Sequence, residues 1–253
     1  MIENQLPIFR FLVQLGDDAL ILSQRLSEWC GHGPVLEQDI ALTNISLDIL
    51  GQARLWYQLA CDHTSESMTE DKIAYKRDSA QMTNLTLVEQ PNGDWGRTVM
   101  RQYLYDSFKK MYYSRLSETH YASIGEIAHK CKTETNYHYK WSKTWVQRLS
   151  MGTEEGHTRM QDALNRLWRF HHELTIPSAT DLEISAEGIA PNPADLKDAY
   201  LEEISSFLTE CTLTIPDDKT VITGGRKGIH TEHLGYILAE MQFLQRAYPD
   251  REW

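Results

Sequence analysis

One helical stripe that carries both an acid and an imidazole constrains this chain most. Between residues 121 and 149, apolar residues recur three and four positions apart, as they do on the buried face of an amphipathic helix. The stripe consists of Ile127, Cys131, Glu134, His138, Trp141, Trp145 and Leu149. A charged group on a buried face is costly unless it is paired, protonated or bound to a metal. Glu134 and His138 therefore need partners from elsewhere in the fold.

The composition is that of a folded protein with an acidic surface. At 253 residues and 41% hydrophobic content, the chain is long enough to bury a large core, and we expect a single domain over residues 1–253. The formal net charge of −11 argues against a nucleic-acid partner, whose phosphates the protein would repel. The nearest basic pair, Arg226 and Lys227, is interpreted as a solvated surface loop.

Cysteine usage and hydropathy indicate a cytoplasmic protein. Cys30, Cys61, Cys131 and Cys211 lie far apart and form no Cys-x-x-Cys motif, so we expect reduced thiols in place of disulfides or a zinc site. No stretch of about 18 apolar residues occurs, and the first residues lack the pattern of a secretion signal. We therefore expect no membrane span.

Helical periodicity recurs along most of the chain. It predicts further long helices at residues 7–29, 36–61, 94–117, 153–174, 192–211 and 231–247, and one or two short helices within 71–88. A polar connection at 62–70, a turn at 90–93 and a break at 150–152 separate these segments. Residues 176–193 are expected to be irregular, and 212–216 and 221–222 to be short strands or extended loops. The pattern predicts an all-α bundle.

Four of the long predicted helices each carry one carboxylate on a core-like face. These residues are Glu28, Asp48, Asp106 and Glu134, the last accompanied by His138. Helical bundles that bind two irons use such a set, usually a Glu on two helices and Glu-x-x-His on the other two, because iron takes carboxylate oxygens and imidazole nitrogens. The arrangement resembles a di-iron site.

The match to that pattern is incomplete. Gly51 stands three residues after Asp48, where an imidazole is needed, and His138 follows Glu134 by four residues, which is still the same helix face. Taken alone, each acid is more simply interpreted as half-exposed, and His138 as a hydrogen-bonded core histidine. Taken together, they predict a metal-free polar network that ties four helices together, because close carboxylates must share protons or find cations. Arg25 near Glu28 and Lys110 near Asp106 are the candidate cations.

Two weaker motifs contain histidine. His157 follows Glu154 by three residues, but Gly156 lies between them and the motif opens a helix, so we interpret it as capping by Thr153 and acids in the first turn. His230 and His233 fall on one helical face without a third ligand. We interpret them as an N-terminal helical turn that contacts a partner.

Four sequence blocks resemble a known family. They are GDDALILSQRLSEWCG at 16–31, SLDILGQAR at 46–54, VEQPNG at 88–93 and GRKGIHTEHLGYILAEMQ at 225–242. These blocks are similar to the structural subunits of bacterial phenylacetyl-CoA 1,2-epoxidases, and the resemblance extends along essentially the whole chain. It implies a ferritin-like four-helix bundle with additional helices.

The resemblance also implies a role. Such a subunit is non-catalytic and pairs with a homologous catalytic oxygenase subunit, which holds the di-iron centre and epoxidises phenylacetyl-CoA with O2 and electrons from a reductase. A small bridging subunit belongs to the same complex. The catalytic relatives have ligands where this chain has Glu28, Asp48, Asp106 and Glu134, and a histidine in place of Gly51. The resemblance therefore implies no metal, cofactor or catalytic residue on this chain, and a complex active in phenylacetate catabolism.

The residues themselves leave two alternatives open. Besides a scaffold, the chain could be a self-sufficient metal-dependent oxidoreductase that uses the degenerate carboxylate site, or a ferritin-like binding or storage protein. Oxygen activation by the chain itself requires the ligand that Gly51 lacks, whereas a scaffold requires only a surface for its partner.

Overall fold

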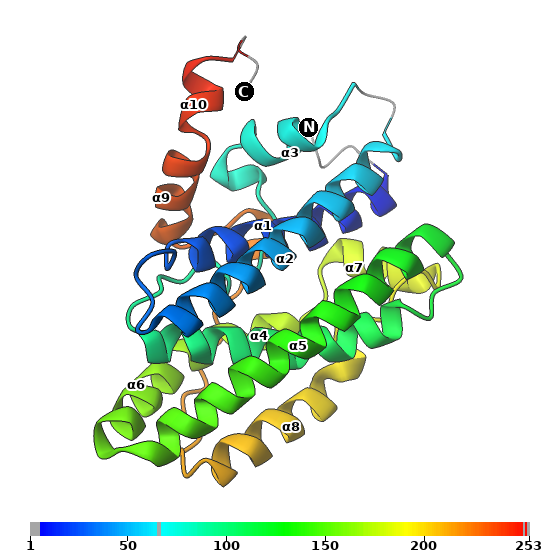
Figure 1. The fold of residues 1–253 in the computed structure, drawn as a ribbon. Coiled ribbons are helices and arrows are strands. Elements are labelled where there is room, and N and C mark those ends of the chain that lie inside the picture. The colour runs from blue at the N-terminus through cyan, green and yellow to red at the C-terminus, as the bar shows by residue number, and fades with distance from the viewer. Residues whose placement is uncertain (1–5, 65–66, 250, 252–253) are drawn as a thin grey trace. The chain divides into compact units, whose positions relative to one another are not determined.

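The structure is a computed structural model, and it describes residues 6–64, 67–249 and 251 (Figure 1). Residues 65 and 66 of the predicted polar connection lie outside the described part. The chain consists of two compact units: Met1–Pro91 with Gly224–Trp253 form unit 1, and Asn92–Thr223 form unit 2. The described residues form helices and loops, without a strand, so the predicted all-α class is confirmed. A single domain over residues 1–253 stays a prediction.

Unit 1 is built on a helical hairpin of α1 (Pro7–Ser27) and α2 (Leu36–Cys61), which lie side by side in Figure 1. Pro7 starts α1, where its missing N–H leaves no bond unmade. The two helices approach closely at Gly16, since a Cβ there would overlap the Tyr57 ring. The predicted helix at 36–61 is confirmed at both ends.

Short elements cover this hairpin. They are α3 (Glu70–Tyr75), η1 (Ser79–Gln81), η4 (Gly225–Lys227), α9 (Glu232–Met241) and α10 (Phe243–Ala247). The predicted final helix at 231–247 is therefore interrupted at Gln242. The Gln242 amide donates to the carbonyls of Ala74 and Arg77 at 3.1 and 3.0 Å, which holds the interruption against the α3 region.

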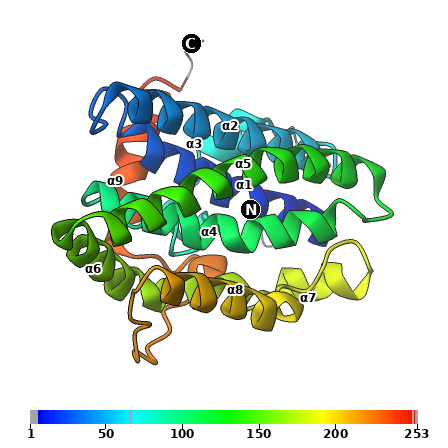
Figure 2. The ribbon, with the colours of Figure 1, turned by 60° about the horizontal axis from the view of Figure 1, so that its bottom comes forward.

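Unit 2 contains the second helical hairpin, α4 (Trp95–Leu116) and α5 (Ala122–Gly152), side by side in Figure 2. Asp94 caps α4, where its carboxylate accepts from the Arg97 N–H at 2.9 Å. Trp95 then packs edge-on against Trp141 and Trp145 of α5, with ring centroids 5.8 and 6.2 Å away. Paired hairpins of this kind are the components of ferritin-like folds.

The rest of unit 2 comprises α6 (Glu154–His171), η2 (His172–Thr175), α7 (Ala179–Ala186), η3 (Pro193–Leu196) and α8 (Lys197–Glu210). The break predicted at 150–152 was placed too early, because α5 continues through Gly152 and only Thr153 is extended. The Thr153 hydroxyl accepts from the Gly156 N–H at 3.0 Å and so starts α6. The two helices thus meet at a single residue.

Two segments of unit 2 were predicted to be irregular or extended, and the structure shows what each of them forms. α7 lies inside the stretch predicted to be irregular, and it forms because Ser178 and Asp181 cap each other reciprocally at its start. Residues 213–223 form neither helix nor strand, and the Ile222 N–H donates to the Arg169 carbonyl at 3.0 Å. Among the residues described, no helix has the length and apolar character needed to span a membrane.

Candidate functional site

The predicted polar cluster divides between the two units. Glu28, Asp48 and Gly51 belong to unit 1, whereas Asp106, Glu134 and His138 belong to unit 2. In the described part of the chain, the structure forms no group of three or more His, Cys, Asp or Glu side chains arranged to hold a metal. One network across four helices stays a prediction, and each half of the cluster has its own set of contacts.

Glu28 lies at the C-terminal end of α1, half-exposed and paired with a cation. Arg25 Nη1 donates to Glu28 Oε1 at 2.7 Å, so this predicted ion pair is present in the structure. The same guanidinium donates to the Glu89 carbonyl at 3.0 and 2.9 Å. Glu28 therefore binds a side chain that is itself held by the backbone of the 82–91 segment.

Gly51 leaves space where a ligand side chain would begin. It lies one helical turn after the half-buried Asp48 on α2, and a Cβ at this position would have no heavy atom of the described residues within 4 Å. Packing at the Cβ position does not require glycine here. The missing imidazole is therefore a feature of the sequence and not a consequence of crowding.

Asp106 is the most completely buried acid of the predicted set. Its Oδ1 accepts from the Gln102 amide at 2.8 Å, and its Oδ2 lies 3.2 Å from the Ser142 hydroxyl on α5. Burial raises the pKa of Asp106 well above its ordinary value, against smaller opposing effects of Ser142 and Gln102. The environment therefore favours the neutral acid, which ties α4 to α5.

The predicted pairing of Lys110 with Asp106 was wrong. Lys110 Nζ lies 2.7 Å from Glu203 Oε1 on α8 and 3.8 Å from the centre of the Tyr139 ring. The side chain of Lys110 is half-buried, while Asp106 is on the fully buried face of α4. The lysine reaches a carboxylate that lies nearer the surface because a charged ammonium keeps part of its hydration there.

Glu134 and His138 on α5 occupy different environments. Glu134 is half-buried, and its Oε1 lies 3.6 Å from the exposed Lys130 Nζ one turn earlier. His138 is fully buried, with the Tyr137 ring edge-on at 6.2 Å between centroids. The helix therefore places the acid at the rim and the imidazole in the interior. The two residues lie four positions apart on α5 and differ in burial.

Sequence reasoning missed a network of buried ion pairs in unit 1. Asp17, completely buried in α1, pairs with Arg77, whose Nη1 lies 3.0 Å from Asp17 Oδ2. Asp17 also accepts from the Tyr57 hydroxyl at 2.6 Å and from the backbone and hydroxyl of Thr83 at 2.7 and 2.8 Å. Two adjacent acids inside the apolar run of α1 were the signal that could have revealed this network.

The neighbouring Asp18 corrects the interpretation of Arg226. Both Asp18 oxygens bind the Arg226 guanidinium, at 3.0 and 2.8 Å, and Asp18 Oδ1 also accepts from the Leu85 N–H at 2.9 Å. Arg226 further donates to the Thr83 carbonyl at 2.6 Å. Arg226 is thus the cation of a largely buried ion pair and not part of a solvated surface loop. Local spacing could not identify this pair because the two residues lie 208 positions apart in the sequence.

His230 is likewise an internal contact. Its Nδ1 lies 2.8 Å from Glu89 Oε2 and its Nε2 lies 3.0 Å from the Met82 carbonyl, and only 4% of its side chain is exposed. Glu89 also accepts from the Thr231 N–H at 2.7 Å. His230 is therefore held within unit 1, and a partner contact by this turn stays a prediction. The side chain joins the segment before α9 to Glu89, while His233 remains partly exposed.

The motif that contains His157 acts as predicted. Glu154 and Glu155 occupy the first turn of α6, and Glu155 pairs with Arg159 at 2.8 Å. His157 Nδ1 lies 3.1 Å from the Ser150 carbonyl, which belongs to the last turn of α5. This confirms capping at the α5–α6 junction.

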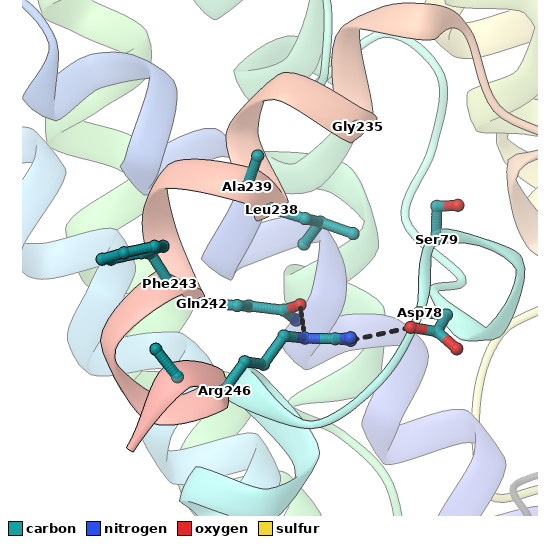
Figure 3. A pocket seen from close by; sticks show the side chains of 9 residues that line it. Asp78, Ser79, Gly235, Leu238, Ala239, Gln242, Phe243 and Arg246 are labelled. Carbon is teal, nitrogen blue, oxygen red and sulfur yellow. Dashed lines mark hydrogen bonds and ion pairs between the residues drawn. The ribbon is translucent and has the colours of Figure 1, made fainter. Parts of the chain in front are cut away.

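An open pocket of about 510 Å3 lies in unit 1 between η1 and the helices α9 and α10 (Figure 3). Leu238, Ala239 and Phe243 supply apolar surface, and Arg246 extends across the pocket toward Asp78. The guanidinium donates to Asp78 Oδ1 at 2.9 Å and to Gln242 Oε1 at 2.8 Å. The charges in this pocket are paired with each other, and the described residues that line it include neither histidine nor cysteine.

Comparison with known proteins defines the class of this chain. Residues 2–253 match the family described as phenylacetic acid catabolic protein, and the chain belongs to that family. A particular relative is one of the subunits of the 1,2-phenylacetyl-CoA epoxidase of Escherichia coli strain K12. The two sequences are 45% identical over 250 residues, which cover 99% of this chain and 100% of the relative. The resemblance seen in the four sequence blocks is confirmed.

Proposed function

We propose that this chain is the non-catalytic structural subunit of a multicomponent di-iron monooxygenase that epoxidises phenylacetyl-CoA in aerobic phenylacetate degradation. Its task is to bind and stabilise a homologous catalytic subunit. Full-length similarity to a protein named as a subunit of such an epoxidase supports membership in an enzyme complex. A cytoplasmic location belongs to the same proposal, and the four free cysteines of the structure are consistent with it.

The non-catalytic assignment rests on the side chains that occupy the positions of the expected iron ligands. A di-iron centre needs deprotonated carboxylates and two imidazoles. In this chain Gly51 supplies no side chain, Glu28 binds Arg25, and the predicted set contains a single imidazole, that of His138. The donors therefore fit a di-iron centre poorly. We assign no catalytic step to this chain and place the di-iron centre on the partner subunit.

The experiment compares the chain alone with the chain co-expressed with the catalytic subunit from the same source. Iron content is measured by mass spectrometry, and phenylacetyl-CoA-dependent oxygen uptake is measured with the reductase and a small bridging subunit added. We expect iron and oxygen uptake only where the catalytic subunit is present. Oxygen uptake by this chain alone would instead support a self-sufficient oxidoreductase. Iron without oxygen uptake would support a ferritin-like binding protein.

A variant of this chain tests the same assignment inside the complex. The double substitution Asp106→Asn and Glu134→Gln replaces two potential ligands by amides of the same shape. We expect the purified complex to keep its subunit ratio and its rate of epoxide formation. A complex that assembles normally but loses activity would place chemistry on this chain and contradict the proposal.

A further inference from the structure

α2 has two apolar faces, and only one of them is buried. Ile45, Ile49 and Trp56 lie on the buried face. A second set, Leu36, Ile40, Leu47 and Leu50, is 72%, 52%, 60% and 39% exposed. A helix with one solvated face normally carries polar residues there. Four large aliphatic side chains on the second face therefore need an explanation.

The exposed residues lie on one side of the helix, with Thr43 between Ile40 and Leu47. Positions 36, 40, 43, 47 and 50 alternate steps of four and three, the spacing that keeps side chains on one side of a helix and that forms the seam between two packed helices. From Leu36 to Leu50 the stripe is about 21 Å long, at about 1.5 Å per residue. We call Leu36, Ile40, Leu47 and Leu50 the α2 stripe. Its length and spacing suit another helix lying along α2.

The charged residues that α2 itself carries near the stripe are acidic. From Leu36 to Ala53, α2 carries Glu37, Asp39 and Asp48 and no Lys, Arg or His. The first cation of the helix is Arg54, whose Nε lies 3.5 Å from Glu70 Oε1. A helix that packs on the stripe therefore meets an apolar seam with an acidic rim. Lysine and arginine beside its own apolar seam would complement that rim.

The same charges disfavour a second copy of this chain as the occupant. A symmetric contact through α2 would bring two acidic rims together, and Arg54, the first cation along the helix, already faces Glu70. The net charge of −11 adds repulsion between copies. A different subunit with a basic rim avoids both costs.

We propose that the α2 stripe is the docking surface for an amphipathic helix with basic flanks on the catalytic subunit. This inference rests on the proposed function, because it names the surface by which the structural subunit holds its partner. The aliphatic side chains form the dry centre of the contact, and Glu37 acts at its rim.

The test is the affinity of this chain for the purified catalytic subunit, measured by biolayer interferometry. Leu47→Lys removes apolar contact and opposes the basic flanks, so we expect binding to weaken about tenfold or more. Adding Ile40→Lys should weaken it about a further tenfold. Glu37→Lys should lower the association rate, and it should reduce the dependence of that rate on salt. The matched control is Leu182→Lys on α7, since Leu182 is an exposed leucine outside the stripe.

The outcomes separate the two proposals. If the wild-type chain does not bind the catalytic subunit, the proposed function fails. If the wild-type chain binds and Leu47→Lys binds equally well, only the docking surface is wrong. A wild-type dimer in sedimentation velocity that Leu47→Lys converts to a monomer would assign the stripe to a second copy and overturn this inference. Unchanged thermal unfolding of the Leu47→Lys chain confirms that any loss of binding is not a loss of folding.

Discussion

Asp17 of unit 1 and Asp106 of unit 2 are both buried aspartates on long helices, yet their surroundings differ. Asp17 pairs with the Arg77 guanidinium and accepts further hydrogen bonds from Tyr57 and Thr83. Asp106 has neutral neighbours, Gln102 and Ser142, as its hydrogen-bond partners. Burial alone favours the neutral acid, whereas a buried cation at contact distance favours the carboxylate. The two positions show how the partner sets the charge of a buried acid.

Two buried histidines repeat the contrast. In unit 1, burial lowers the pKa of His230, but the hydrogen bond and charge of Glu89 outweigh that effect and raise the pKa above its ordinary value. In unit 2, burial and the neighbouring His172 lower the pKa of His171 to about 3. Among the described residues, neither ring nitrogen of His171 has a hydrogen-bond partner, and the Trp168 ring lies 4.1 Å away between centroids. One imidazole is thus an ionic contact and the other an apolar core residue.

The largest expected effect is a difference in the free energy of unfolding between variants of the two aspartates. Asp17→Asn leaves Arg77 buried without a carboxylate, and we expect a loss of about 3–5 kcal/mol in the free energy of unfolding. Asp106→Asn preserves shape and the donors and acceptors of a neutral acid, so at pH 5 it should cost less than about 1 kcal/mol. Urea unfolding of both variants measures the difference. Equal losses would show that Asp106 is also an ionised residue in the folded protein.

The second effect concerns His171. Because the folded pKa is depressed, the unfolded chain takes up a proton below about 6.5 while the folded chain does not, so stability falls as pH falls toward 3. His171→Leu removes this linkage. Relative to the wild type, we expect the free energy of unfolding of the variant to rise by up to about 1.4 kcal/mol for each pH unit below pH 6.5. Urea unfolding between pH 7.5 and 4.5 tests this, and a constant difference would contradict it.

The third effect concerns His230, whose contribution to stability depends on pH in the opposite direction. Because the pKa of His230 is raised, the folded chain holds its proton more tightly, and the stabilisation is present below pH 6.5 and lost as pH rises through the folded pKa. His230→Gln should cost more stability at pH 6 than at pH 8.5. Glu89→Gln is the matched control, since it should abolish the pH dependence without removing the imidazole. A larger cost at high pH would refute the ionic role.

The smallest effect tests the space at Gly51. A Cβ at this position meets no atom of the described residues within 4 Å, and Gly51 lies inside α2, where alanine is the better helix former. Gly51→Ala should raise the free energy of unfolding by about 0.5–1 kcal/mol. Gly16→Ala is the contrasting variant, because its Cβ would overlap Tyr57 and should destabilise unit 1. Thermal unfolding of the two variants gives the comparison.

Local patterns predicted most of the helices well. The helix at 36–61 was predicted at both ends, and the helices at 94–117 and 121–149 within three residues, because periodicity and capping residues act within a few positions of the chain. α7 was missed because a short capped helix of eight residues leaves little periodic signal. The interruption at Gln242 depends on Ala74 and Arg77, which are remote in sequence.

The candidate site was only partly predictable. The chain's own residues identified four carboxylates, His138 and the missing ligand at Gly51, since these follow from residue type and helical spacing. The cation that pairs with the predicted acid was predicted correctly for Glu28 and wrongly for Asp106. Arg25 and Glu28 are neighbours on one helix, whereas the carboxylate that Lys110 binds comes from α8.

Residue type and local spacing were enough to predict the all-α class, the boundaries of most long helices, and the absence of a side chain at Gly51. The tertiary structure decided which buried groups carry charge: it brought Arg226 to Asp18, Arg77 to Asp17 and Glu89 to His230, and it left Asp106 and His171 among neutral neighbours. The physical reason is the sequence distance over which each interaction acts. Helix formation depends on residues within about four positions, whereas protonation depends on whatever charge packing places within a few ångströms.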